Sequence, residues 1–230
     1  MNEIATAPRI IPDRIQRPFD RWKRWEVLLF LVGVIIFVFN AFASPYFLDP
    51  WNLSDATFSF TEKAIIALAM APLIIAGEID LSVASIIALA STAMGAAAVA
   101  GADSATLVVI GLAVGLACGA FNGFVVTRFG VHSIVVTIGT MSLFRGISYV
   151  VLGDQVYRTY PADFAWFGQG YVWWAFSFEF VLFLVLAVVF GVLVHLTVFG
   201  RQVYVVGNNP VAALFSGVRV NRLRFILLLL

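Results

Sequence analysis

Long apolar runs separated by short polar stretches dominate the pattern of this chain. A helix needs about 20 mainly apolar residues to cross the hydrocarbon core of a bilayer, which is roughly 30 Å thick. Six runs meet or approach that length: 27–48, 64–77, 81–102, 104–127, 131–152 and 180–199. A seventh, 225–230, amounts to about 9 Å of helix and cannot cross. The pattern predicts an all-α polytopic integral membrane protein with about six complete transmembrane helices and the start of a seventh.

The composition supports a membrane location. Apolar residues make up 62% of the 230 residues and charged residues only 12%, whereas soluble domains carry roughly 45–50% and about 25%. The net charge of +1 gives no indication of a nucleic-acid partner. Cys118 is the only cysteine, which excludes an internal disulfide and a cysteine-based zinc site.

Basic residues are unevenly distributed between the two sides of the predicted bundle. The N-terminal segment 1–26 contains Arg9, Arg14, Arg17, Arg21, Lys23 and Arg24. If this segment is cytoplasmic, alternation of the spans also places Arg128, Arg201, Arg219, Arg222 and Arg224 on the cytoplasmic side, and only Lys63 and Arg158 outside. Cytoplasmic loops carry the excess of Lys and Arg. We therefore expect a multi-pass membrane protein with a cytoplasmic N-terminus, in which the first run is a retained anchor and not a cleaved signal.

This orientation makes the loop 153–179 external. The loop is rich in aromatic residues: Tyr157, Tyr160, Trp166, Tyr171, Trp173 and Trp174. Such rings are typical of the aromatic belt at a membrane interface. A docking surface for an external partner is the alternative interpretation.

Glycines recur at every fourth position of the run 104–127, as Gly111, Gly115, Gly119 and Gly123. Membrane helices associate through close backbone approach, which small residues permit. This stripe predicts a helix-packing face within the transmembrane domain 27–230, and it carries no information on function.

Two carboxylates, Glu78 and Asp80, interrupt the apolar pattern between 64–77 and 81–102. The first of these runs is only 14 residues, about 21 Å of helix. Ionisable groups at membrane depth are costly and usually face a bundle interior or a water-filled path, and broken helices there often line transport sites. The simpler interpretation is a tight cytoplasmic turn in which Asp80 or Ser82 caps the next helix.

Arg145 is the only strong base inside a predicted span. It can reach outward to the interface, form a structural ion pair, for example with Asp154, or face the solute path. Two separated histidines and one cysteine predict no metal site, and no nucleotide-binding or catalytic motif is present. The chain therefore offers no Walker-type nucleotide site, and the energy for any active transport would come from an ion gradient or another subunit.

The cytoplasmic stretch 200–224 contains a short helix with both ends marked. Asparagine suits the N-cap, proline the first helical position, and glycine the position just past the end. These roles fall to Asn208 or Asn209, to Pro210 and to Gly217. A short, stiff helix of this kind could push against a cytoplasmic partner, and an incidental helical turn is the alternative.

Three segments resemble one known family in the same order along the chain. Residues 77–83, GEIDLSV, resemble the GGIDLSVG signature of the ribose/arabinose/xylose-type permeases of bacterial ABC importers. Residues 137–146, TIGTMSLFRG, resemble that family's T-x-G-T…R-G segment, and residues 199–217 are similar to its cytoplasmic coupling region. Glu78 and Ala84 replace glycines of the family signature. These details, with the run 44–54, are most similar to the rhamnose branch.

The resemblance implies an ATP-driven, binding-protein-dependent importer of a monosaccharide in the bacterial inner (cytoplasmic) membrane, with rhamnose as the expected sugar. A periplasmic binding protein would deliver the sugar to a dimer formed with a second permease copy or a paralogue. Separate cytoplasmic ATPase subunits would bind ATP and Mg²⁺, and this chain would be a transport subunit without a bound cofactor and not an enzyme. The residues implied to couple the permease to the ATPase are Gly207, Asn208, Asn209, Pro210, Ala212, Ala213, Ser216 and Gly217.

Members of that family continue with further spans after the coupling region, so we expect this chain to be a fragment or a truncated product. Two other interpretations stay open. A secondary transporter would use Glu78, Asp80 and Arg145 for proton coupling, and a membrane assembly subunit would not depend on a solute.

Overall fold

The structure is a computed structural model that describes residues 25–230, without the side chain of Glu26. The six basic residues of the segment 1–26 lie outside the described residues, so the cytoplasmic N-terminus stays a prediction. The chain divides into two units, Met1–Leu53 and Ser54–Leu230, which are described separately.

The first unit contains helix α1, Trp25–Ala43, and the start of α2, Pro50–Ile75. The ring of Phe47, in the turn after α1, packs edge-on against Phe37 with centroids 5.2 Å apart. Asp49 then starts α2, because its Oδ1 accepts the N–H of Trp51 at 2.8 Å and Pro50 fits the first helical position, where no N–H is needed.

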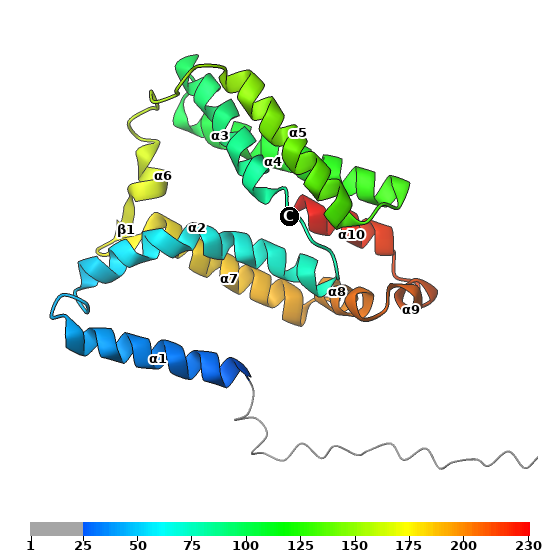
Figure 1. Cartoon of the computed structure of the whole chain (residues 1–230), viewed down its shortest axis with the longest axis horizontal. Coiled ribbons are helices and arrows are strands. Elements are labelled where there is room, and N and C mark those ends of the chain that lie inside the picture. The colour runs from blue at the N-terminus through cyan, green and yellow to red at the C-terminus, as the bar shows by residue number, and fades with distance from the viewer. Residues whose placement is uncertain (1–24) are drawn as a thin grey trace, which may run out of the picture. The chain divides into compact units, whose positions relative to one another are not determined.

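The second unit is helical apart from one short hairpin (Figure 1). After α2 its elements are α3 (Val83–Val99), α4 (Ser104–Phe129), α5 (Ser133–Leu152), α6 (Ala165–Gln169), β1 (Tyr171–Trp173), β2 (Phe176–Ser177), α7 (Phe178–Leu196), α8 (Val198–Asn208), α9 (Pro210–Phe215) and α10 (Val220–Leu229). Helices α3, α4 and α5 pack against one another, and α10 packs along α4.

Among residues 25–230, four helices are long and apolar enough to cross a membrane: α2, α4, α5 and α7. Two shorter apolar helices, Val27–Ala43 and Val83–Val99, correspond to the other predicted spans. The all-α polytopic membrane class is therefore confirmed. The seventh run, 225–230, belongs to α10, which begins earlier, at Val220.

The prediction of a short span at 64–77 is wrong, because α2 has 26 residues and begins at Pro50. Its first half is polar in sequence, but the polar groups bond to the helix itself: Thr61 Oγ1 donates to the carbonyl of Thr57 at 2.7 Å and Lys63 Nζ to that of Ser59 at 2.8 Å. Lys63 therefore lies inside a helix and not in a connecting external segment.

The stretch 200–224 is also more ordered than the predicted loop with one short helix. It contains most of α8, all of α9 and the first half of α10. Thr197 marks the start of α8 in the sequence: it is the N-cap, and its Oγ1 accepts the N–H of Gly200 at 3.3 Å. Gly200 has no side chain because its backbone lies against the carbonyl of Val194, at the sharp junction with α7.

The loop 153–179 folds around its aromatic residues. Trp166 packs on Phe178 with ring centroids 4.8 Å apart, and Trp173 stacks on Phe176 across the hairpin at 6.1 Å. Tyr157 joins the loop to α3, because its ring lies where a Cβ at Gly95 would be, with Cδ2 only 2.5 Å away. The loop is thus held to the ends of α3 and α7.

The glycine stripe of α4 meets two different helices. A Cβ at Gly119 would lie 2.6 Å from the carbonyl oxygen of Leu228, and one at Gly123 would lie 2.9 Å from the ring of Phe225. A Cβ at Gly111 would instead lie 2.9 Å from the Sδ of Met94 in α3, whereas nothing lies within 4 Å of a Cβ at Gly115. Close backbone approach is therefore required where α4 meets α10.

We predict that Gly119→Ala lowers the stability of the solubilised protein by about 1–3 kcal/mol, because the new methyl group forces α10 away from α4. Gly115→Ala is the matched control on the same stripe, where space is open and alanine favours the helix by up to about 1 kcal/mol. Thermal unfolding in detergent measures both. Equal midpoints for the two variants would contradict the packing described here.

Candidate functional site

The main buried apolar core of the second unit lies where the end of α2 meets α4, α5 and α8 to α10. Its members are Leu73, Ala76, Val126, Val136, Val203, Val206, Ala213, Val220, Leu223, Leu227 and Leu228. Helix α9 therefore shares one core with the end of α2, directly before the segment that joins α2 to α3.

That segment, residues 77–82, is called the extended segment here. It joins α2 to α3, and Gly77 opens it with φ at +81°, a conformation that favours glycine. The next residues alternate as in a strand: Glu78, Asp80 and Ser82 are buried, whereas Ile79 and Leu81 are about 40% exposed. Three polar side chains of this turn are therefore buried and not in solvent.

Hydroxyl groups at the start of α5 satisfy the backbone of the extended segment. The N–H of Ile79 donates to Ser133 Oγ at 3.1 Å, and the N–H of Leu81 donates to Thr137 Oγ1 at 3.2 Å. Ser133 and Thr137 lie one turn apart and thus share a helix face. They replace the neighbouring strand that an extended backbone would otherwise need.

A second polar chain links the extended segment to α4. Asp80 Oδ1 accepts both the N–H and the hydroxyl of Ser82, each at 2.6 Å. Ser82 Oγ in turn accepts from Asn122 Nδ2 at 2.8 Å. Ser82 occupies the N-cap position of α3, but its hydroxyl makes no capping bond because it is turned toward Asp80.

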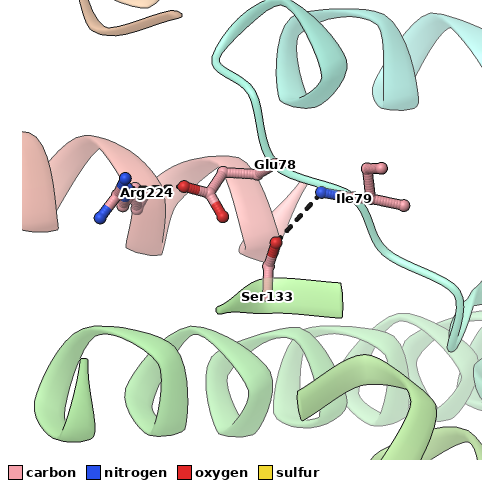
Figure 2. Close-up of polar contacts among 4 residues, drawn as sticks. All are labelled: Glu78, Ile79, Ser133 and Arg224. Atoms are coloured by element: carbon pink, nitrogen blue, oxygen red, sulfur yellow. Dashed lines mark hydrogen bonds and ion pairs between the residues drawn. The ribbon is translucent and has the colours of Figure 1, made fainter. Parts of the chain in front are cut away.

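The carboxylate of Glu78 pairs with Arg224 of α10, with 2.6 Å between Oε1 and Nε (Figure 2). This contact is an ion pair by charge and distance, without an aligned hydrogen bond at Nε. The Glu78 side chain is 7% exposed and that of Arg224 is 32% exposed. It is the only ion pair among the residues whose side chains the structure describes, and a buried carboxylate without it would be costly.

Asp80 also lines a largely apolar cavity of about 340 Å³ between α2, α3, α4 and the end of α10. Three glycines of the α4 stripe, Gly111, Gly115 and Gly119, form part of its wall. Of the three predicted polar candidates, Asp80 alone lines this cavity. Arg145 is exposed on α5 and makes no ion pair with Asp154 in the described part of the chain.

The predicted capped helix is present as α9. Asn209 is its N-cap, and Oδ1 accepts the N–H groups of Val211 and Ala212, both at 3.0 Å. Pro210 is the first helical residue. At the other end Ser216 is the C-cap and Gly217 has φ at +84°, and the N–H of Val218 donates to the carbonyl of Ala213 at 3.0 Å. This pattern is a Schellman motif.

The two faces of α9 differ sharply. Ala213 is fully buried in the core, whereas Val211, Leu214 and Phe215 are 61%, 60% and 87% exposed. Of the remaining predicted coupling residues, Asn208 ends α8 and is exposed, as is Ala212 on α9. Gly207 lies in α8, where its backbone contacts the carbonyl of Ile75 at the end of α2.

The pairing of Glu78 with Arg224 and the hydroxyls of Ser133 and Thr137 were not predicted from the sequence. A weak signal existed for the ion pair, because no acidic residue follows Glu179 and the arginines of the C-terminal region lack local partners. Thr137 opens the family-like segment 137–146, but no contact of its hydroxyl was predicted, and nothing in the pattern distinguished Ser133 from other hydroxyl residues in a span.

Residues 52–230 match the family described as the permease component of the branched-chain amino acid transport system, and the chain belongs to this family. The chain is 30% identical to the ribose import permease protein RbsC of Bacillus subtilis, over 85% of the chain and 60% of the relative. It is 30% identical to the L-arabinose ABC transporter permease protein AraH of Azospirillum brasilense (87% and 60%). It is 32% identical to the autoinducer 2 import system permease protein LsrD of Klebsiella pneumoniae (88% and 63%).

The chain thus spans about 60% of the length of these relatives. No solved structure gives a significant match. The resemblance to the ribose- and arabinose-type ABC permeases is confirmed, whereas these relatives do not single out the rhamnose branch.

We predict that Thr137→Val destabilises the protein by about 1–3 kcal/mol, because it removes the partner of the part-buried N–H of Leu81. Thr92→Val is the matched control, since the Thr92 hydroxyl bonds only to the carbonyl of Ala88 in its own helix. Thermal unfolding of both variants in the same detergent measures the difference. A Thr92 variant as unstable as the Thr137 variant would contradict the assigned role of Thr137.

Proposed function

We propose that the chain is the membrane-spanning permease subunit of a bacterial ATP-driven, binding-protein-dependent importer of a monosaccharide. It is a transport subunit and not an enzyme, and ATP and Mg²⁺ bind to a separate ATPase subunit. The observation that carries the proposal is α9, a helix capped at both ends with an exposed apolar face, in a chain of this permease family.

Helix α9 is suited to receive force from a cytoplasmic ATPase. Its caps keep six residues helical without the support of a long helix. Ala213 anchors one side in the core, and Leu214 and Phe215 extend from the other. In this proposal the exposed side docks on the ATPase, and the segment 1–26 lies on the same, cytoplasmic side of the membrane.

The cavity beside Asp80 is the candidate solute path. A carboxylate in an apolar cavity can accept hydrogen bonds from sugar hydroxyl groups. The glycines that line the cavity have no side chains and so leave room for a solute. We assign no solute contact to Glu78, which pairs with Arg224, or to Arg145, which lies away from the cavity. The periplasmic binding protein would dock on the external side, near the loop 153–179, and a second permease copy or a paralogue would complete the path.

The relatives named above are described as importing ribose, arabinose and autoinducer 2. Rhamnose is the sugar we propose for this chain, on the resemblance of residues 44–54 and 77–83 to the rhamnose branch. Binding measurements of rhamnose, ribose and arabinose to the partner binding protein test this choice directly. Tight binding of ribose or arabinose without binding of rhamnose would overturn it.

The class of transporter is tested in proteoliposomes that contain the permease and its ATPase, with the loaded binding protein outside. We expect uptake only when ATP is enclosed, and no loss of uptake when ion gradients are dissipated. Uptake that needs a proton gradient and no ATP would identify a secondary transporter. The absence of uptake under every condition would favour an assembly subunit.

For α9, we predict that Phe215→Asp lowers ATP-dependent uptake at least tenfold, because a charge on the exposed apolar face opposes docking of the ATPase. Phe215→Leu is the matched control at the same site and should retain most of the uptake. Residue 213 is unsuitable for this test, because a charge there would disrupt the core. Wild-type uptake by Phe215→Asp in correctly inserted protein would contradict the role of α9.

A further inference from the structure

The ion pair between Glu78 and Arg224 connects two parts of the chain to which the proposed function gives different roles. Arg224 lies in α10, the helix that follows α9, whereas Glu78 lies in the extended segment that carries Asp80. Figure 2 shows this pair together with the hydrogen bond from the next residue, Ile79, to Ser133. The extended segment is thus held by contacts to both α10 and α5.

The connection between α9 and Arg224 is stiff. The Schellman motif at Gly217 leads directly into α10, and the N–H of Leu223 donates to the carbonyl of Arg219 at 3.0 Å in its first turn. Val220 and Leu223 are buried in the same core as Ala213. A displacement of α9 therefore moves α10 with it.

A second contact reaches the extended segment from the preceding side. The backbone at Gly207 in α8 touches the carbonyl of Ile75, two residues before Gly77. Val203 and Val206 of the same helix pack in one core with Leu73 and Ala76. This close contact is made by backbone and apolar side chains without a hydrogen bond or ion pair, so it resists approach of α8 to this part of the chain more strongly than separation.

The ion pair between Glu78 and Arg224 opposes separation of α10 from the extended segment. Attraction between opposite charges at 2.6 Å resists separation in a partly buried site, where water screens it poorly. On the far side of the ion pair, Asp80 holds Ser82, and Ser82 is bonded to Asn122 in α4. A movement at Glu78 therefore changes the position of the carboxylate that lines the cavity.

We propose that Glu78 and Arg224 are positioning residues for transport, which form a charge-dependent clamp between α10, the helix that follows α9, and the extended segment. The clamp transmits movement of α9 in both directions to Asp80, so that ATP-driven cycles move solute. This inference rests on the proposed function, because it assigns a role in the same transport cycle.

The first experiment tests the clamp as a contact and needs no partner. Thermal unfolding of the solubilised permease is compared for Glu78→Gln, Arg224→Gln and the exchange Glu78→Arg with Arg224→Glu. We expect each single variant to lower the midpoint and the exchange to recover more than half of the larger loss. Additive losses in the exchanged variant would overturn the clamp, whether or not the protein transports a sugar.

The second experiment tests the positioning role in the reconstituted complex, as solute moved per ATP hydrolysed. We expect each single variant to lower this ratio at least fivefold while ATP hydrolysis continues, and the exchange to restore at least half of it. Arg222→Gln is the matched control, an exposed arginine on the same helix without a carboxylate partner among the described residues, and should stay within twofold of wild type.

Single variants with a wild-type ratio would overturn the proposal. If they fail to insert, the exchanged variant decides, because an assembled variant that hydrolyses ATP without moving solute also overturns it. Wild-type protein without ATP-dependent uptake would instead refute the proposed function, and the stability measurements would still decide whether the clamp exists.

Discussion

The buried polar groups of the extended segment need partners, because the side chains of Glu78, Asp80 and Ser82 lie inside an apolar bundle. An unpaired carboxylate or backbone N–H in such a place costs more free energy than most single contacts contribute. The arrangement of its neighbours follows from this constraint. Helix α5 supplies Ser133 and Thr137, α4 supplies Asn122, and α10 supplies Arg224. Three helices are thereby tied to the six residues of the extended segment.

The same constraint explains why the helices around the extended segment are close together. Helix α10 can place Arg224 beside Glu78 only if it lies along α4, and the glycines at 119 and 123 allow that approach. The core shared by α8, α9 and α10 then fixes the capped helix at the same end of the bundle. A proposed docking helix and a proposed solute cavity are thus joined through the polar contacts of one short segment.

Much of this organisation could be predicted from the sequence, because local signals were strong. Asn209, Pro210 and Gly217 each have a backbone preference that marks a helix end, and the structure places them at the N-cap, the first turn and the left-handed position. The apolar runs likewise identified the membrane helices. The start of α2 was missed because its first half is polar, and its hydroxyl and lysine side chains bond to the helix itself. The partner of Glu78 could not be predicted, since the pairing depends on how distant helices pack.

In the proposed mechanism, helices α9 and α10 and the extended segment move as one unit during transport. Spin labels at Ile79 and Arg222, both exposed, in a Cys118→Ser background measure the distance between them in the assembled transporter. This account predicts the same distance in the nucleotide-free and ATP-bound states, while the distance from Arg222 to Trp174 in the loop 153–179 changes. A shift in the distance between Ile79 and Arg222 on ATP binding would contradict it.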